Sequence, residues 1–410
     1  METVRIYPLA GLPKSYYTRL RQAQMEAARV WTVCRDLHLA ARKLHTRWPD
    51  RNEFQRATRG QFDLHSQTVQ MIFRAFLTNV DTARELRKTN RKIHYPYKDK
   101  SFYPLLWPAQ AVSVERGRIV LPMGRGRQSL VFKLDLSERI GACKLVWKDG
   151  YELHVSVPTK PAPASPGVVQ AAVDLGEIHQ AAVSTNTGAA LVVSGRGMRS
   201  LKRRHNMALG QLDKKRKRCH KGSGRWYKLQ HARRKVSARK RRQIRDLRHK
   251  GTHRVISFCQ QHQVGCLYIG NPHGVREKNN GRHHNQRMAG WEYGKDIAYL
   301  SYKAQLACIE SFTGPERGTS SQCPVCGWKQ KVRGRFWRCR NPRCSFVGHR
   351  DVVGSVNMHP LAFGNKITFP AQITYQRAGP VRVLARNEQP SQVKFSQHVV
   401  VARTRATRRT

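Results

Sequence analysis

The sequence predicts an α/β fold with a second, β-rich part and a small metal-binding insertion. Three observations support this class. An apolar strand pattern ends in Asp174 and a glycine, and it opens a stretch of further strands and long helices. Short β-like runs bounded by glycine and proline occupy much of residues 91–160. Two close cysteine pairs follow between Cys323 and Cys344, at a spacing typical of a tetrahedral metal site.

The charge of the chain restricts its class of function. Its 410 residues include 77 Lys and Arg but only 25 Asp and Glu, which gives a formal net charge of +52. A compact chain with that charge repels itself, and nucleic acid is the expected neutralising partner. The sequence has no apolar span of about 18 residues, so no membrane partner is expected. Ten cysteines without a disulfide framework favour a reducing, cytoplasmic location.

The N-terminal part is predicted to be a β-barrel with an inserted helical domain. Residues 3–8 alternate as a strand, and residues 12–37 and 62–87 carry apolar side chains at helical spacing. Five β-like runs follow, at residues 111–114, 118–121, 129–134, 143–147 and 151–157. The predicted boundaries are 1–10 and 91–160 for the barrel, 11–90 for the helical domain and 161–167 for a proline-rich linker.

The C-terminal part begins with three strand patterns and continues into basic helices. The strands are expected at 169–176, 180–184 and 190–193, and a helical hairpin that turns near 222–224 is expected at 199–261. A buried strand at 264–269 and a helix running into a strand at 291–312 come next. Residues 361–410 are interpreted as a basic tail, partly disordered, because they have no clear pattern.

The basic residues of the hairpin are interpreted as a phosphate-binding face, with a merely solvated helix face as the alternative. Arg350 is added as a candidate phosphate contact, against the alternative that it faces solvent. The predicted nucleic-acid contacts are Arg199, Arg203, Arg204, Lys214, Lys215, Arg233, Arg234, Arg239, Arg241 and Arg350.

The cysteines Cys323, Cys326, Cys339 and Cys344 are predicted to bind one structural Zn²⁺ within a ribbon of residues 319–345. Asp351 follows seven residues after the last of them. An early strand ending in Asp174, a middle strand at 264–269 and a late acid are the order expected of an RNase H-like nuclease core. Such a core gathers carboxylates around two Mg²⁺ ions, which prefer oxygen ligands.

Several short motifs occur in a fixed order between residues 173 and 357. They are Val173-Asp174-Leu175-Gly176 with Ala181, Val183 and Thr187-Gly188, then residues 194–200 and 299–304, then Thr319-Ser320 before Cys323-Pro-Val-Cys326-Gly327, the cysteines Cys339 and Cys344, and Asp351 with Asn357. In this combination the chain resembles the TnpB family of transposon-encoded, RNA-guided nucleases, which are related to type V CRISPR effectors. The resemblance extends over roughly residues 1–360.

The resemblance implies a RuvC-like nuclease over residues 168–318 and 346–360, with the zinc ribbon inserted between them. It also implies that the N-terminal barrel is a wedge-type domain. The inserted helices would be a recognition domain, and together they would hold a guide RNA and read a short motif beside the target DNA.

One position departs from the family. Most relatives have a Glu at the end of the middle strand, where this chain has Gly270. Either the third acid has moved, with Glu316 preferred over Glu310 and Glu177, or the nuclease is inactive. Relocation of the third acid is favoured, because an inactive nuclease core would have little need to keep Asp174 and Asp351 together for metal binding.

The leading hypothesis is therefore a Mg²⁺-dependent, RNA-guided DNA endonuclease with Asp174, Glu316 and Asp351 as its catalytic acids. One alternative is a nuclease-inactive, RNA-guided DNA-binding protein or repressor. Another is a conventional transposase that joins DNA strands, which the family resemblance disfavours.

Overall fold

The computed structural model describes residues 2–134, 136, 139–159, 167–274, 279, 281–332, 334–379 and 393–394. It divides the chain into two compact units, Met1–Lys160 and Pro161–Thr410. The predicted linker falls almost wholly outside the described residues.

The N-terminal unit combines three helices with two small antiparallel sheets. The helices are α1 (Lys14–Lys43), α2 (Arg51–Thr58) and α3 (Ser66–Thr89), and a short 3₁₀ turn, η1 (Ala109–Ala111), follows them in the sequence. One sheet has the order β1 (Glu2–Leu9), β7 (Tyr151–Pro158), β6 (Cys143–Trp147) and β2 (Leu105–Trp107). The other consists of β3 (Ser113–Glu115), β4 (Arg118–Leu121) and β5 (Leu130–Lys133).

The first and last strands of this unit pair with each other, since Glu2 lies opposite Pro158 and Leu9 opposite Tyr151. The helices are therefore an insertion, as predicted. The expected closed barrel is not found among the described residues, where the two sheets share no hydrogen-bonded strand pair. They pack instead around one apolar core that also includes Trp31 and Phe76 of the helices, so side-chain packing takes the place of closure.

The C-terminal unit is built on a mixed sheet of seven strands. Its order is β12 (Glu310–Pro315), β11 (Val264–Asn271), β8 (Val169–Leu175), β9 (His179–Thr185), β10 (Ala189–Ser194), β15 (Gln372–Arg377) and β16 (Val393–Lys394). Strands β8, β11 and β12 are parallel to one another, whereas β8, β9 and β10 form an antiparallel meander. The carboxyl ends of the three parallel strands therefore meet at one edge.

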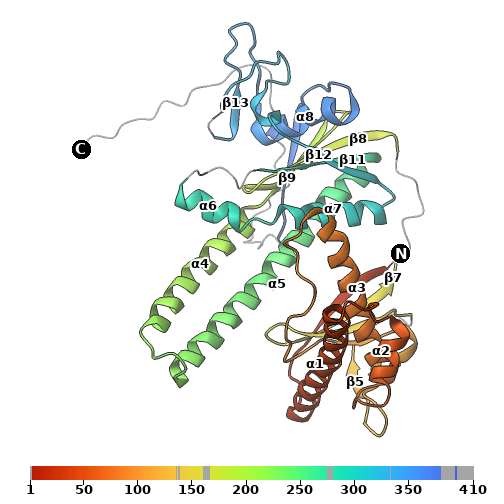
Figure 1. Cartoon of the computed structure of the whole chain (residues 1–410). Coiled ribbons are helices and arrows are strands. Elements are labelled where there is room, and N and C mark those ends of the chain that lie inside the picture. Colours follow the sequence, from red (N-terminus) through yellow and green to blue (C-terminus); the bar gives the residue numbers. More distant parts are fainter. Residues whose placement is uncertain are drawn as a thin grey trace. The chain divides into compact units, whose positions relative to one another are not determined.

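Helices cover both faces of this sheet (Figure 1). Apolar residues of α5 (Gly224–Gln261) and α7 (Tyr293–Leu306) form a core with Val173 and Ile269 on one face. On the other face α8 (Arg350–Phe363) packs against Ala172 and Ala182. Because side chains alternate along a strand, Asp174 points to the α8 face.

The predicted helical hairpin is present. Helix α4 (Arg196–Lys217) and α5 run side by side away from the sheet (Figure 1). Gly222 has a φ of +91°, a value that favours glycine, and the Ser223 side chain caps α5 by accepting from the Trp226 N–H at 3.2 Å. Helix α6 (Arg282–Ala289) lies between β11 and α7 in the sequence.

The remaining elements are small. They are the 3₁₀ turn η2 (Thr319–Ser321), β13 (Phe336–Arg338) and β14 (Val347–His349), the last two forming a two-stranded ribbon. The interpretation of residues 361–410 as a patternless tail is wrong at its start, because α8 ends at Phe363 and β15 joins the sheet beside β10. Residues 380–392 and 395–410 of that predicted tail lie outside the described residues.

Candidate functional site

Asp174 lies at the carboxyl end of β8, against the first turns of α8. A side chain at Gly354 of α8 would collide with the Asp174 carboxylate, so this glycine allows the helix to approach the acid. Gly270 lies beside Asp174 on the neighbouring strand, one residue beyond the paired Ile269 and Val173. The two positions therefore occupy the same edge and the same face of the sheet.

The Glu316 carboxylate fills the space beside Gly270. A Cβ atom at Gly270 would lie 2.6 Å from Glu316 Oε2 and 2.7 Å from Met358 Cε. Glu316 follows β12 directly, and β12 pairs with β11 so that Pro315 is opposite Asn271. The Glu316 carboxylate thus lies next to the position that the Cβ atom of a side chain at residue 270 of β11 would take.

Hydrogen bonds from three side chains fix the loop that carries Glu316. The Tyr268 hydroxyl donates to the Pro315 carbonyl at 2.8 Å, and the Thr319 hydroxyl donates to the Glu316 carbonyl at 2.8 Å. The Asn357 amide of α8 donates to the carbonyls of Thr319 and Gln322, both at 2.7 Å. Helix α8 therefore positions the loop as well as facing Asp174.

Both carboxyl groups are held away from water. Burial raises the pKa of Asp174 well above its usual range, and the charges of Glu316 and Asp351 raise it further. Burial also raises the pKa of Glu316 to about 7, and Glu316 Oε2 is a buried atom without a hydrogen-bond donor. An acceptor of this kind beside a second acid fits a bound divalent cation, which would supply the missing positive charge.

Asp351 lies in the first turn of α8 and faces a different set of partners. His179 Nδ1 lies 2.7 Å from Asp351 Oδ2, and Arg335 Nη1 lies 2.7 and 3.0 Å from the two carboxylate oxygens. Burial alone would raise the pKa of Asp351, but His179 and Arg335 outweigh it and hold that pKa below its usual range. The charge of Asp351 therefore acts on Asp174, while the carboxylate oxygens of Asp351 contact His179 and Arg335.

The other two candidates for the third acid lie elsewhere. Glu310 is exposed at the opposite end of β12, beside Cys266. Glu177 forms ion pairs with Arg199 at 3.2 Å and Arg287 at 3.6 Å. Of the three, Glu316 alone lies beside Gly270.

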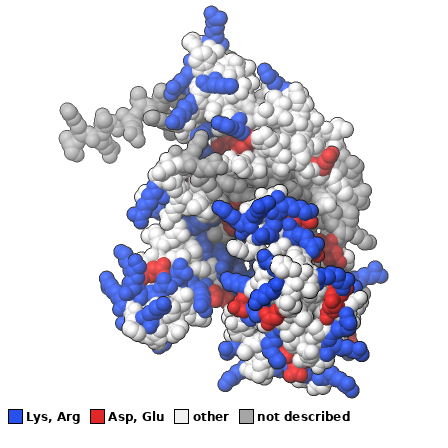
Figure 2. All heavy atoms as spheres, in the orientation of Figure 1, with Lys and Arg blue, Asp and Glu red and all other residues white. Residues whose placement is uncertain are grey.

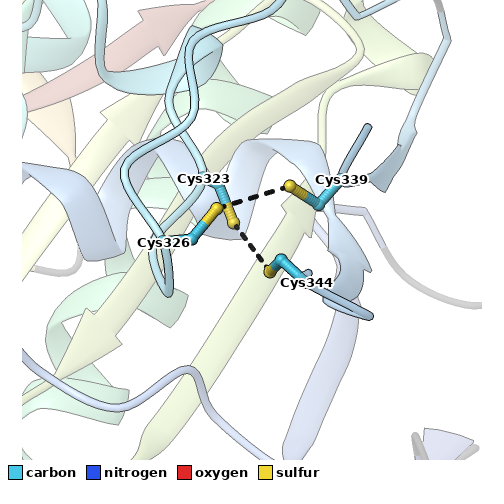
Figure 3. A group of neighbouring side chains, drawn as sticks. All are labelled: Cys323, Cys326, Cys339 and Cys344. Carbon is cyan, nitrogen blue, oxygen red and sulfur yellow. Dashed lines mark hydrogen bonds between the residues drawn. The ribbon is translucent and has the colours of Figure 1, made fainter. Parts of the chain in front are cut away.

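The four cysteines come together as predicted (Figure 3). The sulfur atoms of Cys323 and Cys344 are 3.9 Å apart, and those of Cys326 and Cys339 are 3.5 Å apart. Four thiolates at about 2.3 Å from one tetrahedral ion would be separated by roughly 3.8 Å. A hydrogen bond from the Trp328 N–H lowers the pKa of Cys326 to about 6, which favours the thiolate. The group is thus a candidate metal site.

The predicted phosphate contacts of the hairpin are mostly exposed. Figure 2 shows Lys and Arg gathered over α4 and α5, at the lower left of the view. The exposed members are Arg203, Arg204, Lys214, Lys215, Arg234, Arg239 and Arg241. Arg199 and Arg233 are half-buried and pair with Glu177 and Asp213 respectively. Arg350 is also half-buried and donates to the Val332 carbonyl at 3.3 Å.

A cavity of about 690 Å³, which sequence reasoning missed, is lined by this hairpin, by α6 and by the segment after α6. Lys202 and Lys240 line it, and burial lowers the pKa of each to about 8. Lys202 Nζ lies 3.9 Å from the centre of the Trp291 ring. Lysines beside an aromatic ring suit a nucleotide, because the lysines can contact its phosphate and the ring can contact its base.

His179 was also missed by sequence reasoning. Its only signal is its place five residues after Asp174, at the start of the strand that folds back beside β8.

None of the described helices is long and apolar enough to cross a membrane.

Two known families match successive parts of the chain. The family described as probable transposase (OrfB_IS605) matches residues 152–276, which include Asp174. The Cas12f1-like TNB domain matches residues 293–358, which include Glu316, the four cysteines and Asp351. The curated TnpB-like protein MJ0751 of Methanocaldococcus jannaschii is 32% identical over 163 residues, which are 38% of this chain and 56% of that protein. The chain thus spans about half the length of this relative.

Solved structures give the likeness of the whole fold. A cryo-EM structure of Cas12f1 with sgRNA and target DNA matches with a TM-score of 0.59 at 13% identity, covering 85% of this chain and 86% of that one. The mini-RNA-guided endonuclease CRISPR-Cas_phi3 matches with a TM-score of 0.48 at 9% identity, covering 90% and 94%. The chain therefore has a Cas12-like fold with a TNB domain, and its resemblance to the TnpB family is confirmed.

Proposed function

We propose that this chain is an RNA-guided DNA endonuclease, in which a guide RNA selects the target and a RuvC-like centre cuts it. The position of Glu316 carries this proposal. Its carboxylate lies beside Asp174 at the place left free by Gly270, so the chain has an acid where the family resemblance expects one. A degenerate site would have no reason to keep a buried, unpartnered carboxylate oxygen there.

Asp174, Glu316 and Asp351 would hold the catalytic Mg²⁺ ions. When bound, such a metal pair activates a water molecule and stabilises the leaving oxygen of the phosphodiester. The protein's part is to hold Asp174 on strand β8, Asp351 at the start of α8, and Glu316 on a hydrogen-bonded loop directly after β12. Arg335 and Arg350 would face the phosphate, since their charges already act on the carboxylates.

Asp351 would have to separate from Arg335 to join the other two acids. The donor atoms of the three carboxylates do not form a ready-made cluster among the described residues. Arg335, which pairs with Asp351, is 39% exposed and can turn toward a phosphate of the substrate. Substrate binding would then free Asp351 for the metal at the moment of use.

The cysteine group would bind one structural Zn²⁺ and make residues 319–345 a zinc ribbon. Trp337 is fully buried there beside Cys323, Cys339 and Val353 of α8. The ion would therefore hold the ribbon against the helix that carries Asp351. We assign residues 168–318 and 346–360 to the RuvC-like core, together with the end of α8 and strand β15, because β15 pairs with β10 in the same sheet.

The guide RNA and the target DNA would be bound mainly through phosphates. The exposed cations of α4 and α5 suit this role, and a net charge of +52 requires such a partner. The N-terminal sheets would act as the wedge-type domain and α1 to α3 as the recognition helices. Base pairing would supply the sequence specificity, while the protein reads shape and a short adjacent motif.

The test is a Mg²⁺-dependent cleavage assay with the copurified RNA and matching DNA. Asp174→Ala should stop cutting and Glu316→Ala should cut about 1,000-fold more slowly, whereas Glu310→Ala should cut at the parental rate. Parental cutting by Glu316→Ala would refute the proposed third acid. Guided binding without cutting by the parental protein would favour the inactive alternative.

A further inference from the structure

A second group of metal-binding side chains lies beside the proposed Mg²⁺ centre. Among the described residues, His179, His349 and Asp351 place their ligand atoms within 4.8 Å of one another, as the four cysteines do. No role for either histidine follows from a carboxylate-only nuclease centre. We propose that these three side chains bind one divalent transition-metal ion.

The three side chains stand on fixed elements. His179 begins β9, and His349 ends β14 directly before α8. The two imidazole rings are 5.0 Å apart between their centres, and Tyr375 of β15 packs against His349 at 5.8 Å. A site held by two strands and the start of a helix keeps its geometry better than a site on loops.

One buried atom in the group has no partner. His349 is only 8% exposed, and its Nδ1 atom lacks a hydrogen-bond partner in the structure. Leaving a buried ring nitrogen unpaired is costly, and a metal ion would remove that cost. The ring that carries this atom lies beside the ring of His179, so the unpaired nitrogen borders the proposed site.

The site is also electrostatically suited and open to solvent. A cation already occupies the position next to Asp351, since Arg335 contacts both carboxylate oxygens. His179, His349 and Arg335 line a cavity of about 740 Å³ that also reaches Tyr375. An ion could therefore enter and displace the half-exposed Arg335, and water could complete its coordination.

The ligand set indicates the kind of metal. Two imidazoles and one carboxylate with open positions suit Mn²⁺, Fe²⁺, Co²⁺ or Zn²⁺, whereas Mg²⁺ prefers oxygen ligands alone. Asp351 would be shared between this ion and the proposed Mg²⁺ centre. A metal held by the histidines would thus fix the position of one catalytic acid.

The test measures metal binding by the full chain without nucleic acid, so its result does not depend on the nuclease. One equivalent of Mn²⁺ is added to tag-free protein, and pulsed EPR is used to detect ¹⁴N coupling from imidazole. The coupling should be present in the parental protein and in Asp174→Asn. It should be lost in the double variant H179N/H349N and retained in the matched control H283N/H284N on α6.

Absence of ¹⁴N coupling in the parental protein would overturn the proposal, whatever the variants do. Coupling that persists in the folded double variant would also overturn it, because the nitrogen would then come from other histidines. If the double variant does not fold, the single variants H179N and H349N serve in its place, and each should reduce the coupling. A failure of guided cleavage would leave all of these outcomes unchanged.

Discussion

The contact between Glu316 and Gly270 predicts that a single methyl group will impair cleavage without unfolding the protein. In Gly270→Ala the new Cβ would lie 2.6 Å from Glu316 Oε2 and 2.7 Å from Met358 Cε, and ordinary contact begins at 3.4 Å. Both atoms are the far ends of flexible side chains, so they can move aside with little loss of stability. The Glu316 carboxylate must then shift by about 0.8 Å, which is the difference between those distances.

A displacement of about 1 Å in a catalytic group costs about 100-fold in rate. We therefore expect Gly270→Ala to cut about 100-fold more slowly at an almost unchanged melting temperature. Glu316→Ala should lose about 1,000-fold, because a metal-held carboxylate contributes several kcal/mol and each 1.4 kcal/mol is a factor of about ten. The double variant Gly270→Glu with Glu316→Ala should recover part of that loss, since it moves the acid onto the middle strand.

The assay is single-turnover cleavage of labelled DNA in Mg²⁺ with saturating guide RNA. Gly210→Ala is the matched control, because a Cβ at that glycine of α4 meets no other atom within 4 Å. Cutting by Gly270→Ala at the parental rate would refute the reasoning, and so would a double variant no faster than Glu316→Ala.

Three further predictions concern the rest of the chain. Trp337→Ala should cost about 3–5 kcal/mol and lower the zinc content, as measured by denaturant unfolding and metal analysis, because the ring is fully buried beside the cysteines. Burial lowers the pKa of His359 to about 4 from 6.5, so the stability it contributes above pH 6.5 is lost as the pH falls through 4. His359→Gln, which keeps a donor for the Ser184 carbonyl, should remove about 3 kcal/mol of that acid sensitivity in unfolding curves between pH 7 and pH 3. Arg203→Ala with Arg204→Ala should weaken RNA and DNA binding regardless of sequence and reduce the salt slope by about two, as measured by titration at several salt concentrations.

Local sequence patterns predicted most of the helices and strands. The strand that contains Asp174 and the turn at Gly188, with a φ of +86°, follow from residue types that act within a few positions. The hairpin break before Ser223 does so as well. Pairing between distant strands was harder to predict. Strand β15 was missed because its six residues form a strand only through parallel pairing with β10.

The same limit applied to the candidate site. The sequence alone does not distinguish among Glu177, Glu310 and Glu316. Only the register of β12 on β11 brings Glu316 beside Gly270. The partnership of His179 with Asp351 joins residues 172 positions apart. The barrel was overpredicted because short alternating strands indicate a curved sheet but do not reveal whether its edges close.

The central claim is that RNA directs this chain to cut DNA. The most direct measurement compares cleavage by the purified protein with and without its copurified RNA, on DNA that matches that RNA, in the presence of Mg²⁺. The account predicts cutting only when RNA, matching DNA and Mg²⁺ are all present, with none by Asp174→Ala. Cutting or strand joining that proceeds without RNA would contradict it.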